Sequence, residues 1–283
     1  MKIGITGASG QLGAATVAEL RSRAPAAELV GISRTPDKVN ALGIEARFGD
    51  FDQPESLARA FVGIDRLLII PSSDMRPGVR ATQGREAIER AAQAGVEHVV
   101  FTSALGTRSA GIPHLWQSYY VPEQALMRTA KRWTILRMAY YAESFVDEVR
   151  MSLPRGVHAA TSNARVNFVA RGDVGAAAAG ILLGEGHHGA IYQATGPAAL
   201  DGAARAGLVS KVTGKNFSFA QVSADQYRDG LAAAGLPPFV VEAVLSIQDM
   251  WATGGFDVTA GDVERLAGRP ARSLEEVLRQ ARL

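Results

Sequence analysis

The chain has 283 residues, of which 47% are hydrophobic and 20% charged, a composition typical of a folded protein with a sizeable core. Its 30 Lys and Arg residues nearly balance 28 Asp and Glu residues, so bulk charge does not indicate a nucleic-acid-binding protein. The absence of cysteine excludes disulfides, thiolate nucleophiles and thiolate metal ligands.

Neither the apolar runs nor the N-terminal residues indicate a membrane protein. No apolar run approaches the roughly 18 residues that a membrane helix needs. The first residues, Met1–Gly7, lack the basic start, apolar stretch and cleavage site of a signal peptide. His187 and His188 lie in a glycine-rich turn without further ligands, which favours a surface loop over a metal site. We therefore expect a cytoplasmic protein without a metal or a nucleic-acid partner.

Short apolar runs alternate with helical patterns through the first half of the chain, which is typical of βα units and a parallel sheet. Leu67–Ile70 is apolar throughout, as expected for a strand covered on both faces. The predicted strands are Lys2–Thr6, Glu28–Ser33, Ile44–Phe48, Arg66–Ile70, Glu97–Thr102 and Trp133–Arg137. The predicted helices are Gln11–Arg23, Pro36–Leu42, Pro54–Phe61, Gly78–Ala94 and Val121–Ala130.

Strands become scarcer after Arg137, and aromatic residues cluster at Tyr140, Tyr141 and Phe145. The strands predicted here are Val166–Val169, Ala190–Ala194 and Phe217–Val222. The helices predicted here are Gly172–Leu183, Leu200–Val212, Ala224–Ala234, Phe239–Ala252 and Ser273–Ala281. Trp116, Tyr119 and Tyr120 are expected in a loop, either as core packing or as a lid over a substrate.

The expected fold is α/β, a Rossmann-type doubly wound parallel sheet with a small C-terminal α/β lobe. Residues 1–150 are predicted to form the dinucleotide-binding domain, with later segments rejoining its sheet. Residues 151–283 are predicted to form a smaller lobe that walls a substrate cleft over the strand ends.

A glycine turn follows the first predicted strand and opens the first predicted helix, the context in which such a pattern indicates a dinucleotide site. Gly7 permits a tight turn, Gly10 lets the backbone approach a pyrophosphate, and Gly13 lets the helix pack closely on the strand. The helix N-terminus offers N–H groups to the phosphates. The cofactor-binding residues predicted here are Gly7, Ser9, Gly10, Gln11, Leu12 and Gly13. The alternative is a glycine-rich turn without a ligand.

The end of the second strand favours one cofactor. A site specific for NAD places Asp or Glu there, whereas Arg accommodates a 2′-phosphate. This chain has Arg34 at that position and Lys38 nearby, which favours NADP(H). The alternative is that Arg34 is an ordinary solvated side chain.

Polar residues also follow the third, fourth and fifth predicted strands. Asp50 and Phe51 could contact an adenine, while Asp52 could equally cap the helix that begins at Pro54. By the switch-point rule, the small polar residues after the next two strands lie along the cofactor crevice. These residues are Ser72, Ser73, Thr102 and Ser103.

The chain also resembles a known family over nearly its whole length. The motifs that carry the resemblance are Ile5–Gly13, Arg34–Lys38, Phe101–Ser103, Glu123–Leu126, Thr134–Arg137, Tyr141–Phe145, Tyr192–Gly196 and Gly254–Phe256. In these motifs the chain is similar to the NmrA-like atypical short-chain dehydrogenases, in particular to type 2 quinone reductases and triphenylmethane-dye reductases. The Leu-Arg-x-x-x-Tyr-x-Glu arrangement is much more particular to this group than the glycine turn.

The resemblance implies NADPH as the hydride donor, no flavin or metal, and a planar electron-poor acceptor such as a quinone. It also implies that the segment Arg137–Phe145 borders the nicotinamide, so Tyr141 and Glu143 become substrate-cleft candidates. Met138 stands where the quinone reductases commonly have Asn, a departure that bears on the choice of acceptor. A homodimer is a possible assembly.

The residues of orthodox alcohol dehydrogenation are absent. Those enzymes use Tyr-x-x-x-Lys, whereas Tyr119 is followed at this spacing by Glu123, which would raise the tyrosine pKa. Glu123 is better explained as a structural tie between its helix and a neighbouring strand or loop. The sequence therefore favours an NADPH-dependent reductase. The alternative is a non-catalytic NADP(H) sensor, and an isoflavone-reductase-like enzyme is disfavoured because no Lys is suitably placed in Tyr119–Gln124.

Overall fold

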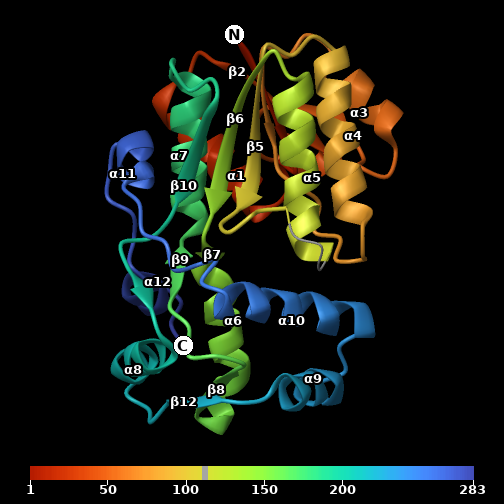
Figure 1. Cartoon of the computed structure of the whole chain (residues 1–283). Helices are drawn as coiled ribbons and strands as arrows, with labels where there is room; N and C mark the ends of the chain where they lie inside the picture. The colour runs from red at the N-terminus through yellow and green to blue at the C-terminus, as the bar shows by residue number, and fades with distance from the viewer. Residues whose placement is uncertain (110–113) are drawn as a thin grey trace.

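A parallel sheet forms the centre of the computed structural model, which describes residues 1–109 and 114–283. Within these residues the main sheet has seven strands in the order β10-β6-β5-β4-β1-β2-β3 (Figure 1). The strands are β1 (Lys2–Thr6), β2 (Glu28–Ser33), β3 (Glu45–Phe48), β4 (Arg66–Ile69), β5 (His98–Ala104), β6 (Arg132–Met138) and β10 (Ala190–Ala194). The order reverses at β1, so the carboxyl ends of β1 and β4 form the switch point at which ligands bind in such sheets.

Two layers of helices cover this sheet. One face carries α1 (Gln11–Arg23), α7 (Arg171–Leu183) and α11 (Asp262–Ala267), and the other carries α3 (Pro54–Ala60), α4 (Val79–Gln93) and α5 (His114–Thr129). The short helix α2 (Pro36–Asn40) follows β2. Small residues let α7 lie close to α1, because a Cβ added at Gly175 would be 3.0 Å from the backbone nitrogen of Thr16. In the described residues, none of the helices has the length and apolar character needed to cross a bilayer.

The remaining elements form a lobe beneath the carboxyl ends of the strands, as Figure 1 shows. Its helices are α6 (Ala142–Ser152), α8 (Gly202–Thr213), α9 (Ala224–Ala233), α10 (Pro238–Ala252) and α12 (Leu274–Gln280), with a 3₁₀ turn at Leu153–Arg155. Its strands are β7 (Tyr140–Tyr141), β8 (Val157–Ala160), β9 (Val166–Val169), β11 (Ala199–Leu200) and β12 (Ser218–Gln221). They pair as two small sheets, β11-β9-β7 and β12-β8.

The fold class predicted from the sequence is confirmed, and a late segment does rejoin the main sheet. Residues Ala190–Ala194 pair in parallel with β6, and α7 packs on α1. These later elements belong to the sheet and its helical layer. The division of the chain into two domains near residue 150 stays a prediction.

Several local expectations are wrong, among them the helix start at Leu200, which lies in β11. Trp116, Tyr119 and Tyr120 lie inside α5 and not in a loop, because this helix begins at His114 and continues through Pro122. Trp116 is 1% exposed, so it packs in the core. The prediction also missed α6, which starts directly after Tyr141.

Candidate cofactor and substrate site

One cavity of about 510 Å³ lies across the carboxyl ends of the central strands, a volume within the range of about 300–1,000 Å³ found for small-molecule and cofactor sites. Most of its wall comes from the ends of β1, β2, β3 and β4 and the loops that follow them, with further residues from α1, α3, α4, β7 and α7. The lining residues are Thr6, Gly7, Ser9, Gly10, Gln11, Leu12, Gly13, Ile32, Ser33, Arg34, Gly49, Asp50, Phe51, Asp52, Leu57, Ile70, Pro71, Ser72, Ser73, Asp74, Gln83, Tyr141 and Arg171.

The glycine turn has the geometry that a phosphate-binding turn requires. Gly7 has φ of +64°, a conformation that costs other residues strain, and its carbonyl accepts from the Gly10 N–H at 2.9 Å. A Cβ at Gly13 would lie 2.3 Å from the Gly7 carbonyl oxygen. The N-cap of α1, Gly10, has no side-chain cap, and the first turn carries no acidic residue. The positive end of this helix therefore faces the cavity, and no carboxylate of its own first turn neutralises it. This arrangement fits a bound phosphate.

The end of β2 is joined to this turn by a pair of hydroxyls. Ser9 Oγ and Ser33 Oγ lie 2.7 Å apart, and Ser33 Oγ also accepts from the Thr35 N–H at 3.0 Å. Arg34, the next residue, is exposed and lines the cavity. Lys38 is exposed on α2 and is not among the lining residues. Sequence reasoning overlooked Ser33, although its place beside Arg34 at a strand end was a usable signal.

The end of β3 contributes Asp50, Phe51 and Asp52 to the lining. The side chain of Asp50 accepts from the Asp52 N–H at 3.0 Å, forming a tight turn. Asp52 does not cap α3, whose N-cap is Gln53 and has no side-chain cap. The carboxylate of Asp52 instead accepts from Nε2 of Gln83 at 2.7 Å.

Gln83 of α4 connects two of the loops that line the cavity. Its side chain is 6% exposed, donates to Asp52, and accepts a hydrogen bond from the Ser72 hydroxyl. The chain Ser72–Gln83–Asp52 thus fixes the loops after β3 and β4 relative to each other. No local pattern in the sequence marks Gln83, because its partners are 11 and 31 residues away.

Near Ser72, Asp74 also faces the cavity and is held by Arg76. The Asp74 carboxylate accepts from the Arg76 backbone N–H at 2.8 Å and from its guanidinium. These hydrogen bonds hold the pKa of Asp74 below its ordinary value, so the carboxylate stays ionised. Ser73 follows Ser72 in the lining.

Tyr141 and Arg171 line the cavity from the side of the lobe. The Arg171 guanidinium carbon lies 4.5 Å from the centroid of the Tyr141 ring, a cation–π arrangement. The Tyr141 hydroxyl donates to the Met138 sulfur at 3.1 Å. Burial, and next the nearby Tyr119, raise the pKa of Tyr141, although Arg171 opposes this shift. The phenol therefore stays protonated and keeps its hydrogen bond to Met138.

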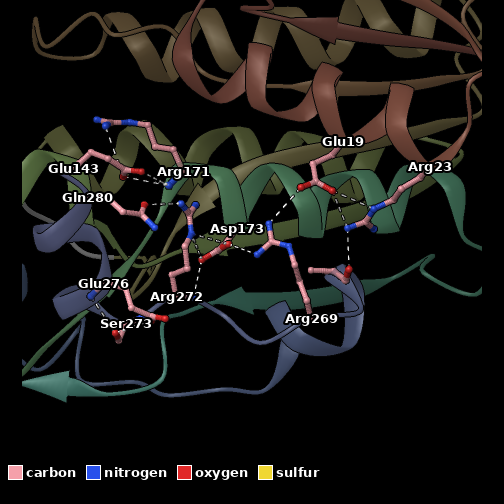
Figure 2. Close-up of polar contacts among 11 residues, drawn as sticks. Glu19, Arg23, Glu143, Arg171, Asp173, Arg269, Arg272, Ser273, Glu276 and Gln280 are labelled. Carbon is pink, nitrogen blue, oxygen red and sulfur yellow. Dashed lines mark hydrogen bonds and ion pairs between the residues drawn. The ribbon is translucent and has the colours of Figure 1, made fainter.

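Two of the three substrate-cleft candidates, Met138 and Glu143, are not lining residues but contact Tyr141 or Arg171, which are. Met138 is 7% exposed, and its sulfur accepts the hydrogen bond from the Tyr141 hydroxyl. Glu143, in the first turn of α6, accepts from the backbone N–H of Arg171 with both carboxylate oxygens, at 3.0 and 3.1 Å (Figure 2). Glu143 thus caps α7 and fixes the start of the helix that carries Arg171.

Two further candidates, Thr102 and Ser103, are fully buried on β5 and are not among the lining residues. Ser103 Oγ donates to Glu123 at 2.6 Å, and Arg137 donates to the same carboxylate at 2.9 and 2.7 Å. Glu123 therefore ties α5 to β5 and β6, which is the structural role favoured from the sequence.

Comparisons with known proteins agree with this geometry. A family model described as NAD(P)H-binding matches residues 7–185. Quinone oxidoreductase 2 of Escherichia coli is 31% identical, with 97% of this chain and 96% of the relative covered. The NAD(P)H azoreductase of Xenophilus azovorans is 24% identical, with 96% of this chain and 95% of the relative covered.

Solved structures extend the similarity to the whole fold. The Citrobacter sp. triphenylmethane reductase complexed with NADP(H) superimposes with a TM-score of 0.90 at 32% identity, covering 99% of both chains. The NADPH-dependent quinone oxidoreductase from Escherichia coli complexed with NADPH gives a TM-score of 0.91 at 30% identity, covering 98% of this chain and 99% of the other. The chain therefore belongs to the NAD(P)H-binding, NmrA-like atypical short-chain dehydrogenase family and is an NAD(P)H-dependent oxidoreductase of the quinone-reductase type.

Proposed function

We propose that this chain uses NADPH to reduce a quinone or a similar planar, electron-poor acceptor. The observation that carries the proposal is a single cavity with two different ends. The glycine turn and Arg34 line one end, and the aromatic ring of Tyr141 lines the other. This arrangement suits a dinucleotide with a flat acceptor beside it.

The choice of NADPH over NADH rests on the end of β2. The residues there are Ser33 and Arg34, where an NAD-specific site would present a carboxylate to the ribose. A guanidinium can bind a 2′-phosphate through two parallel hydrogen bonds. The solved structures of two relatives contain NADP(H) or NADPH, which supports a preference for NADPH over NADH.

When bound, the cofactor supplies a hydride, and the protein supplies binding, orientation and a dry environment. The uncapped start of α1 would bind phosphate, and Tyr141 lines the cavity with an aromatic side chain. A quinone needs little more, because its delocalised π system takes a hydride without strong carbonyl activation. Glu123 is committed to Arg137 and Ser103, which fits an enzyme that does not use the tyrosine–lysine pair.

The test is steady-state oxidation of NADPH by the purified protein with a panel of naphthoquinones, benzoquinones and azo and triphenylmethane dyes, and with NADH as the comparison. We expect turnover of at least one quinone and a clear preference for NADPH. Tight binding of NADPH without turnover on any acceptor would contradict the proposal and favour a redox sensor.

A further inference from the structure

Arg171 is a positively charged residue at the Tyr141 end of the cavity. It is the first residue of α7, and its side chain is 20% exposed. Its Nη2 donates to the Ser144 hydroxyl at 3.0 Å, which uses one of the five N–H groups that a guanidinium carries. The cation therefore retains donors beside the surface on which a flat acceptor would stack.

The strand order separates this residue from the adenosine end. Arg34 and Asp52 follow β2 and β3, on one side of β1, whereas Tyr141 follows β6, on the other side. If Arg34 binds the 2′-phosphate, the Tyr141 end is left for the reacting half of the cofactor and for the acceptor. Arg171, which is stacked on Tyr141, belongs to that half.

The start of α7 is held on both sides. On one side, both oxygens of Glu143 accept from the backbone of Arg171, and Glu143 Oε2 lies 3.7 Å from Arg171 Nη1. On the other side, the fully buried Asp173 accepts from the guanidinium of Arg269 at 2.6 Å and from the backbone N–H of Arg272 at 2.8 Å (Figure 2). A donor held in place before the reaction stabilises developing charge at little reorganisation cost.

We propose that Arg171 binds the acceptor and stabilises the negative charge that forms on its oxygen, so that the site favours neutral or anionic quinones over cationic dyes. This inference rests on the proposed function. It adds the charge class of the acceptor and the residue that selects it.

The charge balance of the reaction explains the preference. A quinone that gains a hydride becomes a hydroquinone monoanion while NADPH is oxidised to NADP⁺, and the monoanion then takes one proton from water. A cationic triarylmethane dye that gains a hydride becomes a neutral molecule and develops no negative oxygen. The Arg171 guanidinium therefore stabilises the first product and repels the second acceptor.

The first experiment measures equilibrium binding to the NADP⁺-loaded protein and does not depend on turnover. Three probes are used: 2-hydroxy-1,4-naphthoquinone, which is an anion at neutral pH, its neutral 2-methoxy analogue, and a cationic triphenylmethane dye. We expect Arg171→Met to raise the Kd of the anion roughly tenfold, about 1.4 kcal/mol, to change the neutral analogue little, and to lower the Kd of the dye. Arg85→Met, on the exposed face of α4, is the matched control and should change none of them.

The second experiment measures kcat/KM for 1,4-naphthoquinone. Loss of one preorganised donor to a developing oxyanion typically costs on the order of 100-fold, and Arg171→Lys should recover part of that loss. An equal loss of affinity for all three probes, or an unchanged Kd for the anion, would overturn the proposal. A raised Kd for NADP⁺ itself would assign Arg171 to the cofactor and also overturn it. Failure of the unaltered chain to bind NADPH would refute the proposed function, and this inference with it.

Discussion

At the scale of single residues, we propose that Arg34 selects NADPH over NADH. Its side chain is exposed at the edge of the cavity, directly after β2. We expect Arg34→Ala to raise the Kd of NADPH by about 10- to 100-fold, since a hydrogen bond to a charged group contributes roughly 1.5–3 kcal/mol. The Kd of NADH should hardly change, because NADH has no 2′-phosphate.

The measurement is a fluorescence titration of both cofactors, with Lys38→Ala as the comparison. Lys38 is outside the cavity lining, so its variant should have a much smaller effect. Equal losses for NADPH and NADH in the Arg34 variant would mean that this residue does not read the phosphate.

We expect His98 to make the stability of the protein depend on pH. It is 4% exposed on β5, and its Nε2 lies 2.8 Å from Thr134 Oγ1 of β6. Burial, and then the nearby Arg66 and Arg132, lower its pKa from 6.5 to about 4. Between these values the unfolded chain binds the extra proton, so stability increases with pH across this window.

His98→Gln should remove this contribution while keeping a polar partner for Thr134. The free energy of unfolding of the unaltered protein, relative to the variant, should fall by up to about 3 kcal/mol as the pH drops from 7 to 4. Urea denaturation at several pH values measures it. Parallel pH profiles for the two proteins would show that His98 is not titrating in this window.

The glycine turn and Arg34 could be predicted from the sequence because each depends on neighbours in the chain. A turn that needs positive φ at Gly7 requires glycine, and a strand end places Arg34 at the crevice. Gln83 could not be found this way, and the sequence placed Arg171 at a helix start without indicating its contact with Tyr141. Their roles depend on contacts with Asp52 and Tyr141, which are distant in sequence and come close only in the folded chain.

At the scale of elements, the start of α7 is one structural link between the nucleotide-binding sheet and the tail of the chain. Asp173 is fully buried in the first turn of α7 and binds Arg269 and Arg272, which precede α12 (Figure 2). Arg269 also contacts Glu19 of α1 at 3.2 Å. The Asp173 carboxylate thus connects α7 with the tail. Arg269 connects the tail with α1 through Glu19.

Asp173→Asn should destabilise the protein by about 2–3 kcal/mol, because the buried carboxylate accepts several charge-assisted hydrogen bonds. Thermal or urea denaturation measures the change. Asp225→Asn is the matched control, since Asp225 is paired with Arg228 on the exposed face of α9 and should contribute nothing measurable. A negligible effect of Asp173→Asn would show that this carboxylate does not hold the tail in place.

Element boundaries were predictable where the chain itself marks them. The glycine turn and the basic last turn delimit α1, whose predicted and observed bounds are both Gln11–Arg23. Pro122 misled the prediction, because proline usually lies near the start of a helix. Here α5 continues through Pro122, whose ring lies against Gly84 of α4, where a Cβ would be 2.6 Å away.

At the scale of the whole molecule, both halves of the chain build the cavity. The first half supplies the glycine turn and the strand-end loops, and the second supplies Arg171, which lies beside Tyr141. A ligand that contacts both halves should stabilise the folded chain as one unit. The sequence predicted the class of this fold, whereas the alignment of α7 with α1 depends on close packing at Gly175 and is visible only in the structure.

NADPH at about one hundred times its Kd should add roughly 2.7 kcal/mol to the stability and raise the Tm by about 5 °C. NADH at the same concentration should raise it less. Differential scanning fluorimetry measures both shifts. A Tm that does not respond to NADPH would contradict binding in this cavity.

The proposed function requires direct hydride transfer from NADPH to a quinone within this cavity. A single-turnover reaction tests it, in which the NADPH-loaded protein is mixed anaerobically with one equivalent of 1,4-naphthoquinone, without flavin and in the presence of a chelator. We expect one hydroquinone per NADPH and slower transfer from NADPH deuterated at C4. NADPH that stays bound and unoxidised, or oxidation that requires added flavin or metal, would contradict it.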